Sequence, residues 1–132
     1  MTHQSILPEG WPRPKGYANG VVARGRQLFI AGMIGWDGHC VFHTDDFAAQ
    51  ARQALQNVAD VLRAAGGLPE HIVRMTWYVT DKREYLAASR DIGRAFREVI
   101  GCYDIAMTAV EVRALMEDRA KVEIEATAVL PD

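Results

Sequence analysis

Apolar and polar residues alternate most clearly near the C-terminus of the chain. In residues 121–128, KVEIEATA, the even-numbered positions are Val, Ile, Ala and Ala, and the odd-numbered positions are Lys, Glu, Glu and Thr. A period of two is typical of a β-strand with one packed face and one wet face. The pattern therefore predicts a strand on which Glu123 and Glu125 share the polar face. Another strand is predicted just before it, from Ile105 onward.

Two β-favouring runs, 17–23 and 28–34, are separated by the short polar stretch 24–27. Such a pair predicts a β-hairpin. Residues 35–45 begin with Gly-Trp-Asp-Gly. They therefore predict a loop that contains a tight turn.

The first helix is predicted from apolar residues that recur at three- and four-residue spacing between Phe47 and Ala65. This spacing places one apolar stripe on one helix face. Asp45 or Asp46 can cap its start by accepting backbone N–H bonds, and Gly66-Gly67 can supply the left-handed stop.

Residues 72–80 then predict a strand. Asp81 followed by Glu84 makes a variant of the capping box for a second helix, whose apolar positions run from Tyr85 to Val99. Gly101 ends that helix.

The predicted order is ββαβαββ, a single β-sheet with two helices on one face, which is an α+β architecture. Two helices cover only one sheet face, and Met75, Trp77 and Val79 are expected to leave apolar area on the other. A large uncovered apolar patch usually marks an interface. The pattern therefore predicts an oligomer.

Composition fits one domain spanning residues 1–132. Apolar residues make up 49% and charged residues 24% of the chain, as in ordinary globular proteins. The net charge of -2 gives no general attraction for nucleic acid, which requires a basic face. No segment approaches the ~20 apolar residues that span a bilayer. We expect neither nucleic acid nor membrane as a partner.

The N-terminal residues 1–15 are rich in proline and polar residues. Pro12 and Pro14 exclude a helix there and predict an extended arm. The stretch does not read as a signal peptide. Cys40 and Cys102 fall in a predicted loop and at a helix end, which favours reduced thiols over a disulfide framework. We therefore expect a cytoplasmic protein.

Two segments resemble motifs of the Rid family, the reactive intermediate deaminases formerly called YjgF. The stretch 121–129, KVEIEATAV, is similar to the family's C-terminal VEIEAIAV, and 16–20, GYANG, is similar to its GPY-x-x-G motif. The resemblance covers nearly the whole chain from Gly16 onward. It implies the Rid fold, which resembles chorismate mutase, and a homotrimer with a central barrel. It also implies ligand clefts between subunits and no cofactor.

The family motifs assign candidate site residues. Glu123 takes the place of the glutamate that helps to position a water or proton; its alternative is a solvated strand residue. Met107 stands where a deaminating member carries its substrate-binding arginine, in PARS. Tyr17 matches a cleft-lining tyrosine, although a core or turn tyrosine is the alternative. Gly32 matches a strand end whose backbone contacts ligand.

Trp36 follows the second strand and is a candidate ligand-facing aromatic or interface anchor; burial against the sheet is the alternative. Residues 39–46, HCVFHTDD, contain metal-capable residue types at close spacing. No second pair with a recognisable metal-site spacing occurs elsewhere, and the family needs no metal. The sequence therefore predicts no metal site.

The missing arginine limits the function that the resemblance implies. A guanidinium holds a carboxylate through two parallel hydrogen bonds, which methionine cannot reproduce. We expect a small-molecule ligand that lacks a carboxylate at Met107 or carries an apolar group there. One hypothesis is an enamine or imine deaminase that acts on other substrates than typical 2-iminoacids, with Glu123 aiding proton transfer. The alternative is a non-catalytic metabolite-binding or interaction protein on the same scaffold.

Overall fold

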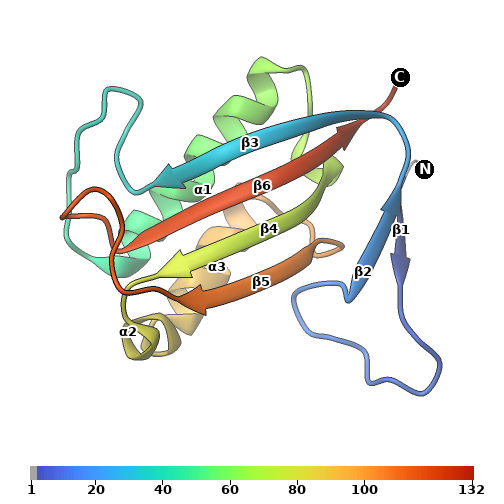
Figure 1. Cartoon of the computed structure of the whole chain (residues 1–132), viewed down its shortest axis with the longest axis horizontal. Helices are drawn as coiled ribbons and strands as arrows, with labels where there is room; N and C mark the ends of the chain where they lie inside the picture. The colour runs from blue at the N-terminus through green and yellow to red at the C-terminus, as the bar shows by residue number, and fades with distance from the viewer. Residues whose placement is uncertain (1–2) are drawn as a thin grey trace.

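A four-stranded sheet in the order β3-β6-β4-β5 forms the centre of the computed structural model, which describes residues 3–132 (Figure 1). Its strands are β3 (Arg26–Ile34), β6 (Val122–Leu130), β4 (Ile72–Val79) and β5 (Ala106–Glu111). Strand β6 runs antiparallel to both of its neighbours, whereas β4 and β5 are parallel. Parallel neighbours need a crossover connection, and helices supply it here.

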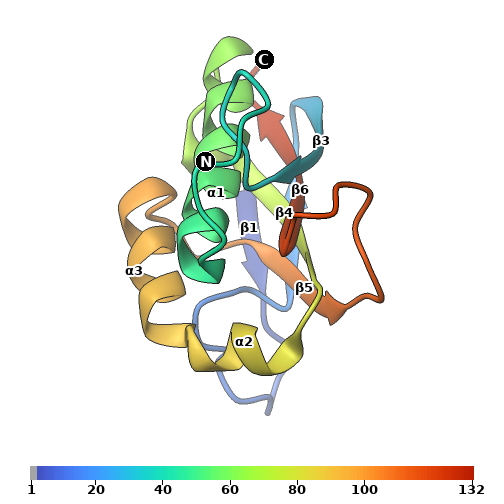
Figure 2. The ribbon, with the colours of Figure 1, turned by 90° about the vertical axis from the view of Figure 1, so that its left-hand side faces the viewer.

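Helices cover one face of this sheet and leave the other face open (Figure 2). They are α1 (Phe47–Ala64), α2 (Lys82–Ala87) and α3 (Ser89–Val99), and a short 3-10 helix, Pro69–His71, precedes β4. The predicted α+β class, with helices on one face of a sheet, is confirmed. Among residues 3–132, no helix has the length and apolarity that crossing a bilayer requires.

The core lies between α1 and the helix-facing side of β6. Val122 and Ile124 of β6 are fully buried. The α1 residues that bury completely against the core follow the predicted spacing: Ala51, Ala54, Leu55, Val58 and Leu62. Each large aliphatic side chain buried in this way stabilises the fold by roughly 1.5–3 kcal/mol.

The ends of α1 follow the local sequence signals. Asp46 is the N-cap, and its carboxylate accepts a 2.9 Å hydrogen bond from the Ala49 backbone N–H. Gly66 follows the helix with φ of +81°, the left-handed conformation that glycine adopts without a Cβ clash. Both predicted signals are confirmed.

The second predicted helix is divided into α2 and α3 at Ala88. Asp81 caps α2 by accepting bonds from the backbone N–H groups of Arg83 and Glu84, at 2.9 and 3.2 Å. The Glu84 carboxylate accepts a 3.2 Å bond from Lys121 Nζ, so it ties α2 to the end of the loop before β6. The break at Ala88 was not predicted because the apolar spacing continues across it.

The predicted hairpin of the first two runs is wrong. Strand β2 (Gly20–Ala23) pairs with β1 (His3–Ile6) in a separate two-stranded sheet, and β3 pairs with β6. Strand β3 thereby extends the face that the helices cover, which buries Ile30 in the core. The predicted arm contains β1, and its residues 1 and 2 lie outside the described residues.

A second correction concerns the apolar residues of β4. Met75, Trp77 and Val79 were expected on the uncovered face, but they are 0%, 4% and 2% exposed beneath the helices. The open face of β4 carries Arg74 and Tyr78 instead. The prediction that Met75, Trp77 and Val79 share one face of the strand was correct. Alternation alone does not say which of the two faces the helices cover.

Gln50 of α1 is a fully buried polar residue that joins three segments of the chain. Its Nε2 donates to the backbone oxygens of Thr44 and Arg119, at 3.0 and 2.9 Å. Its Oε1 accepts a 2.9 Å bond from the Lys121 backbone N–H. The loop before α1 and the loop before β6 are therefore held to the helix by one amide.

We predict that Gln50→Leu lowers the free energy of unfolding by about 2–4 kcal/mol, because it leaves a buried N–H and two backbone carbonyls without partners. Urea unfolding measures the loss. Gln56→Leu is the matched control, since the Gln56 amide bonds only to Asp60 on the same helix, at 2.9 Å. An equal loss in the two variants would contradict the role assigned to Gln50.

Candidate functional site

Strand register places the predicted site residues on two faces of the sheet. Met107 of β5 pairs with Met75 of β4, which is buried beneath the helices. Glu123 of β6 pairs with Tyr78 of β4 on the opposite parity. Paired residues in a sheet point to the same face. Met107 therefore lies on the helix side, and Glu123 lies on the open side.

A pocket of about 380 Å³ lies on the helix side, between the arm, β5 and the α2–α3 segment. Met107 and Ile92 contribute aliphatic surface to its wall. Five aromatic side chains also line it: Tyr17, Trp77, Tyr85, Phe96 and Tyr103. The structure thus brings Tyr17 and Met107 together in one pocket.

The polar groups of this pocket are mostly neutral hydroxyls. Trp77 is 4% exposed, and its Nε1–H has no hydrogen-bond partner among the described residues. Its ring lies in an edge contact with Tyr85, with centroids 6.1 Å apart. Burial raises the pKa of Tyr85 above its ordinary value. None of the described side chains that line the pocket is an aspartate or a glutamate, and Lys15 is its one charged side chain.

Glu123 and Gly32 form a separate pair on the open face. A Cβ built on Gly32 would overlap the Glu123 carboxylate, so glycine is required for the carboxylate to lie where it does. Neighbouring Tyr78 donates a 2.6 Å hydrogen bond to Glu125 Oε1, and this bond raises the pKa of Tyr78. Gly32 and Glu123 therefore lie against each other, on the opposite face of the sheet from Met107 of the same chain.

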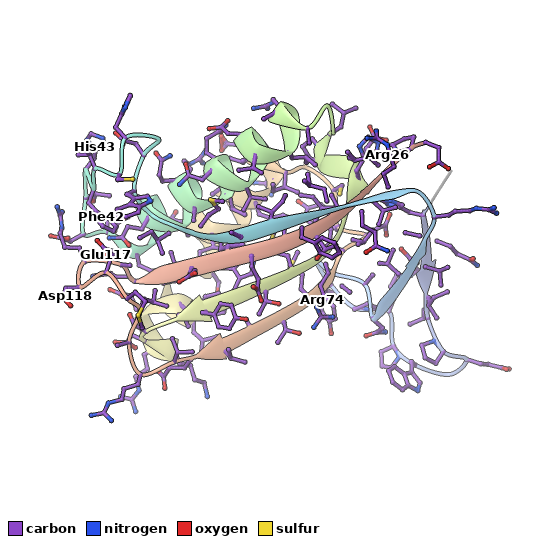
Figure 3. The ribbon with its side chains drawn as sticks, turned by 45° about the horizontal axis from the view of Figure 1, so that its top comes forward. Arg26, Phe42, His43, Arg74, Glu117 and Asp118 are labelled. Atoms are coloured by element: carbon purple, nitrogen blue, oxygen red, sulfur yellow. The ribbon has the colours of Figure 1, made fainter. Side chains whose placement is uncertain are left out.

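Trp36 lies in neither group. It is partly buried in the loop between β3 and α1, where its ring centroid is 5.7 Å from that of Phe42. The Arg119 guanidinium lies 5.3 Å from the Phe42 centroid and donates to Asp45 at 3.0 Å. Phe42 and His43 lie at the end of the molecule that also carries Glu117 and Asp118 (Figure 3). Two loops meet there.

The metal-capable residues of this loop serve its own structure. Asp37 accepts a 2.7 Å bond from the His43 ring and bonds from the backbone N–H groups of His39 and Val41. The His43 bond and the two backbone bonds lower the pKa of Asp37 to about 2. Its bonds to the loop are therefore fully present above the usual carboxyl pKa of 3.8 and are lost only as the pH falls through about 2. Among residues 3–132, no cluster of three metal-capable side chains is suited to hold an ion.

Sequence reasoning missed several pocket residues. Lys15 belonged to a segment predicted as an extended arm, and Tyr85 was assigned to the apolar stripe of a helix. Tyr103 follows the helix stop at Gly101 and stacks on Phe96, with centroids 5.7 Å apart. Nothing local in the sequence places these residues beside Met107, because the pocket forms only when the arm, β5 and the helices pack together.

Comparison with known proteins identifies this architecture. A sequence model of the family described as Endoribonuclease L-PSP matches residues 12–130. A solved structure of a conserved Rid-family protein of unknown function from Yersinia pestis has a TM-score of 0.87 and 32% identity, over 98% of this chain and 100% of that chain. The fold is therefore that of the Rid proteins.

Two relatives of known family agree over almost their full length. A RutC family protein of Synechocystis is 33% identical over 99% of both chains. A 2-iminobutanoate/2-iminopropanoate deaminase of Salmonella typhimurium is 34% identical over 96% of this chain and 97% of its own length. The chain belongs to the Rid (YjgF) family.

Proposed function

We propose that the chain is a homotrimeric Rid protein that binds a small molecule in the aromatic pocket and hydrolyses its C=N bond. Its substrate is an enamine or imine other than a typical 2-iminoacid. The observation that carries this proposal is Met107 in the wall of an otherwise aromatic pocket. A similar chain from Salmonella typhimurium is named a 2-iminobutanoate/2-iminopropanoate deaminase, which supports the class of reaction.

Methionine at this position excludes the usual way of holding a 2-iminoacid. Each charge-assisted hydrogen bond from an arginine is worth about 1.5–3 kcal/mol, and a thioether donates none. An apolar group of the ligand gains instead from contact with Met107 and the rings around it. The favoured substrate therefore carries an apolar group where a 2-iminoacid carries its carboxylate.

The proposed hydrolysis needs a carboxylate beside the bound C=N carbon. Glu123 of the same chain is on the other face of the sheet, so we assign this role to Glu123 of a neighbouring subunit. Water adds to the C=N carbon as the carboxylate accepts its proton, and the π electrons move to nitrogen. The carboxylic acid returns this proton to the nitrogen, which gives a carbinolamine. The carbinolamine hydroxyl then gives its proton, through the same carboxylate, to the amino nitrogen, the C–N bond breaks to release ammonia, and the O–H electron pair forms the C=O bond of the product.

Assembly through the open sheet face is part of this proposal. Phe29 on β3 is 72% exposed and Val110 on β5 is 42% exposed on this side. Between them lie the polar groups Arg74, Tyr78 and Glu125. A second copy would remove the exposed rings and aliphatic groups from water.

The second candidate function is ligand binding without hydrolysis. It is favoured by the lack of any aspartate or glutamate among the described side chains of the pocket. Both functions need the pocket, but only hydrolysis needs Glu123. A test of Glu123 therefore separates them.

We predict a particle of about three times the chain mass of 14.7 kDa in sedimentation at micromolar concentration. Phe29→Asp is expected to dissociate it, because a buried unpaired carboxylate is costly. Leu86→Asp is the control, because Leu86 is 55% exposed on the helix side. A monomer mass for the unaltered chain would refute the trimer.

We predict that Glu123→Gln slows imine hydrolysis by about 10²–10⁴-fold, the usual contribution of a general acid or base. Benzylideneamine, generated in situ from benzylamine by an amine oxidase, is a suitable substrate. The absorbance of the benzaldehyde product measures its hydrolysis. Glu125→Gln is the control on the same strand face and should retain activity. If the unaltered chain binds aromatic ligands but does not accelerate hydrolysis, the second candidate function is correct.

We predict that Met107→Arg creates affinity for pyruvate, a stable analogue of a small 2-iminoacid, which the unaltered chain lacks. Calorimetric titration measures the affinity, and a thermal melt should show a folded protein because Met107 lines an open pocket. Met107→Leu is the control and should bind no pyruvate. Unfolding of Met107→Arg with no binding would place Met107 in a dry core and remove the basis of the proposal.

A further inference from the structure

Lys15 gives the aromatic pocket a positive charge. This charge comes from the N-terminal arm and not from position 107 on β5. Lys15, Gly16 and Tyr17 all line the pocket. Lys15 is exposed and takes part in none of the ion pairs formed within residues 3–132. Most other basic residues also form no ion pair within the described part of the chain, but none of them lines this pocket.

The segment that carries Lys15 is fixed to the strand that carries Met107. The Ala18 backbone N–H donates a 2.9 Å bond to the Ile105 oxygen, and Ala18 forms a parallel bridge with Ala106. Gly16 adopts φ of +81°, which turns the chain between Lys15 and this anchor. The backbone beside Lys15 is therefore held at β5, and Lys15 is an exposed residue of the pocket lining.

We propose that Lys15 determines specificity by binding an anionic group at the pocket mouth, while an aryl or alkyl body of the same ligand packs against Met107. This inference rests on the proposed function, which places the ligand in this pocket. The ligand class is an amphipathic anion, such as an arylalkyl carboxylate, whose charge is separated from the group that contacts Met107.

The charged group of the pocket favours an anion over a cation. The other polar side chains that line it, such as Tyr17, Tyr85 and Ser89, are neutral hydroxyls that can donate to an anion as well as accept a hydrogen bond. No carboxylate side chain among the described residues lines the pocket to neutralise a bound cation, and Lys15 would repel one. Aromatic rings alone attract cations, but here the one ionic group favours the opposite charge.

Three probes separate the charge of the ligand from its ring: phenylacetate, the neutral phenylacetamide, and acetate. Calorimetric titration of the full chain should show phenylacetate binding about tenfold more tightly than phenylacetamide, the effect of one charge-assisted contact. Acetate should bind more weakly than either, because it lacks the ring. In Lys15→Gln the preference for phenylacetate should disappear, whereas affinity for phenylacetamide should not change.

Two further variants make the outcome decisive. Lys82→Gln is the matched control, because Lys82 is exposed on α2 and does not line the pocket, and it should keep the preference. Gly93→Leu places a side chain into the open space beside α3 and should abolish binding of both ring-bearing probes.

Equal affinity for the two ring-bearing probes, or a preference that survives in Lys15→Gln, overturns the role of Lys15 and leaves the proposed pocket intact. Binding of ring-bearing probes that Gly93→Leu does not reduce places the ligand elsewhere and overturns both proposals. Failure of both ring-bearing probes to bind the unaltered chain also overturns both.

Discussion

Burial of the even-numbered residues of β6 beneath α1 is the constraint from which the arrangement of the site follows. Val122 and Ile124 are fully buried, so the intervening Glu123 must point to the other face. The pairing of β4 and β5 continues the same parity and places Met107 under the helices with Met75. A slip of one residue would exchange the faces and expose the core row, which is why the register is fixed.

The same constraint places the pocket residues and Glu123, the candidate acid or base, on opposite faces of the sheet within one chain. No change of side-chain rotamer carries a carboxylate from one face of a sheet to the other. The pocket on the helix side and the Gly32–Glu123 pair on the open side can therefore meet only between two subunits. In the proposed trimer, assembly would add catalysis to a pocket that one chain already forms.

Elements that depend on nearby residues were predictable from the sequence. The stripe of α1, its Asp46 cap and the alternation of β6 all rest on spacings of two to four residues. The pairing of β2 with β1 was not predictable, because Gln4 meets Val22 across a long connection. The face of Trp77 was misjudged for a related reason: alternation defines two faces, but only packing of the helices chooses the buried one.

The same distinction between local signals and long-range packing applies to the candidate site residues. Tyr17, Gly32, Met107 and Glu123 were reached through motifs that resemble those of the Rid family, and the structure groups them in two pairs. Lys15 and Tyr103 carry no such motif, and they come to Met107 only through the packing of the arm and the end of α3.

A cation on β5 and a cation on the arm would have different chemical consequences. An arginine at position 107 would hold a charge next to the reacting carbon of a 2-iminoacid. Lys15 is on a separate segment that joins β5 only through Ala18. An anion bound there is displaced from the part of the ligand that contacts Met107. The C=N carbon can then carry an apolar substituent while the molecule keeps its negative charge elsewhere. A different position of one cation would therefore give a different substrate specificity. The sheet, the helices and the carboxylate on the open face would stay the same.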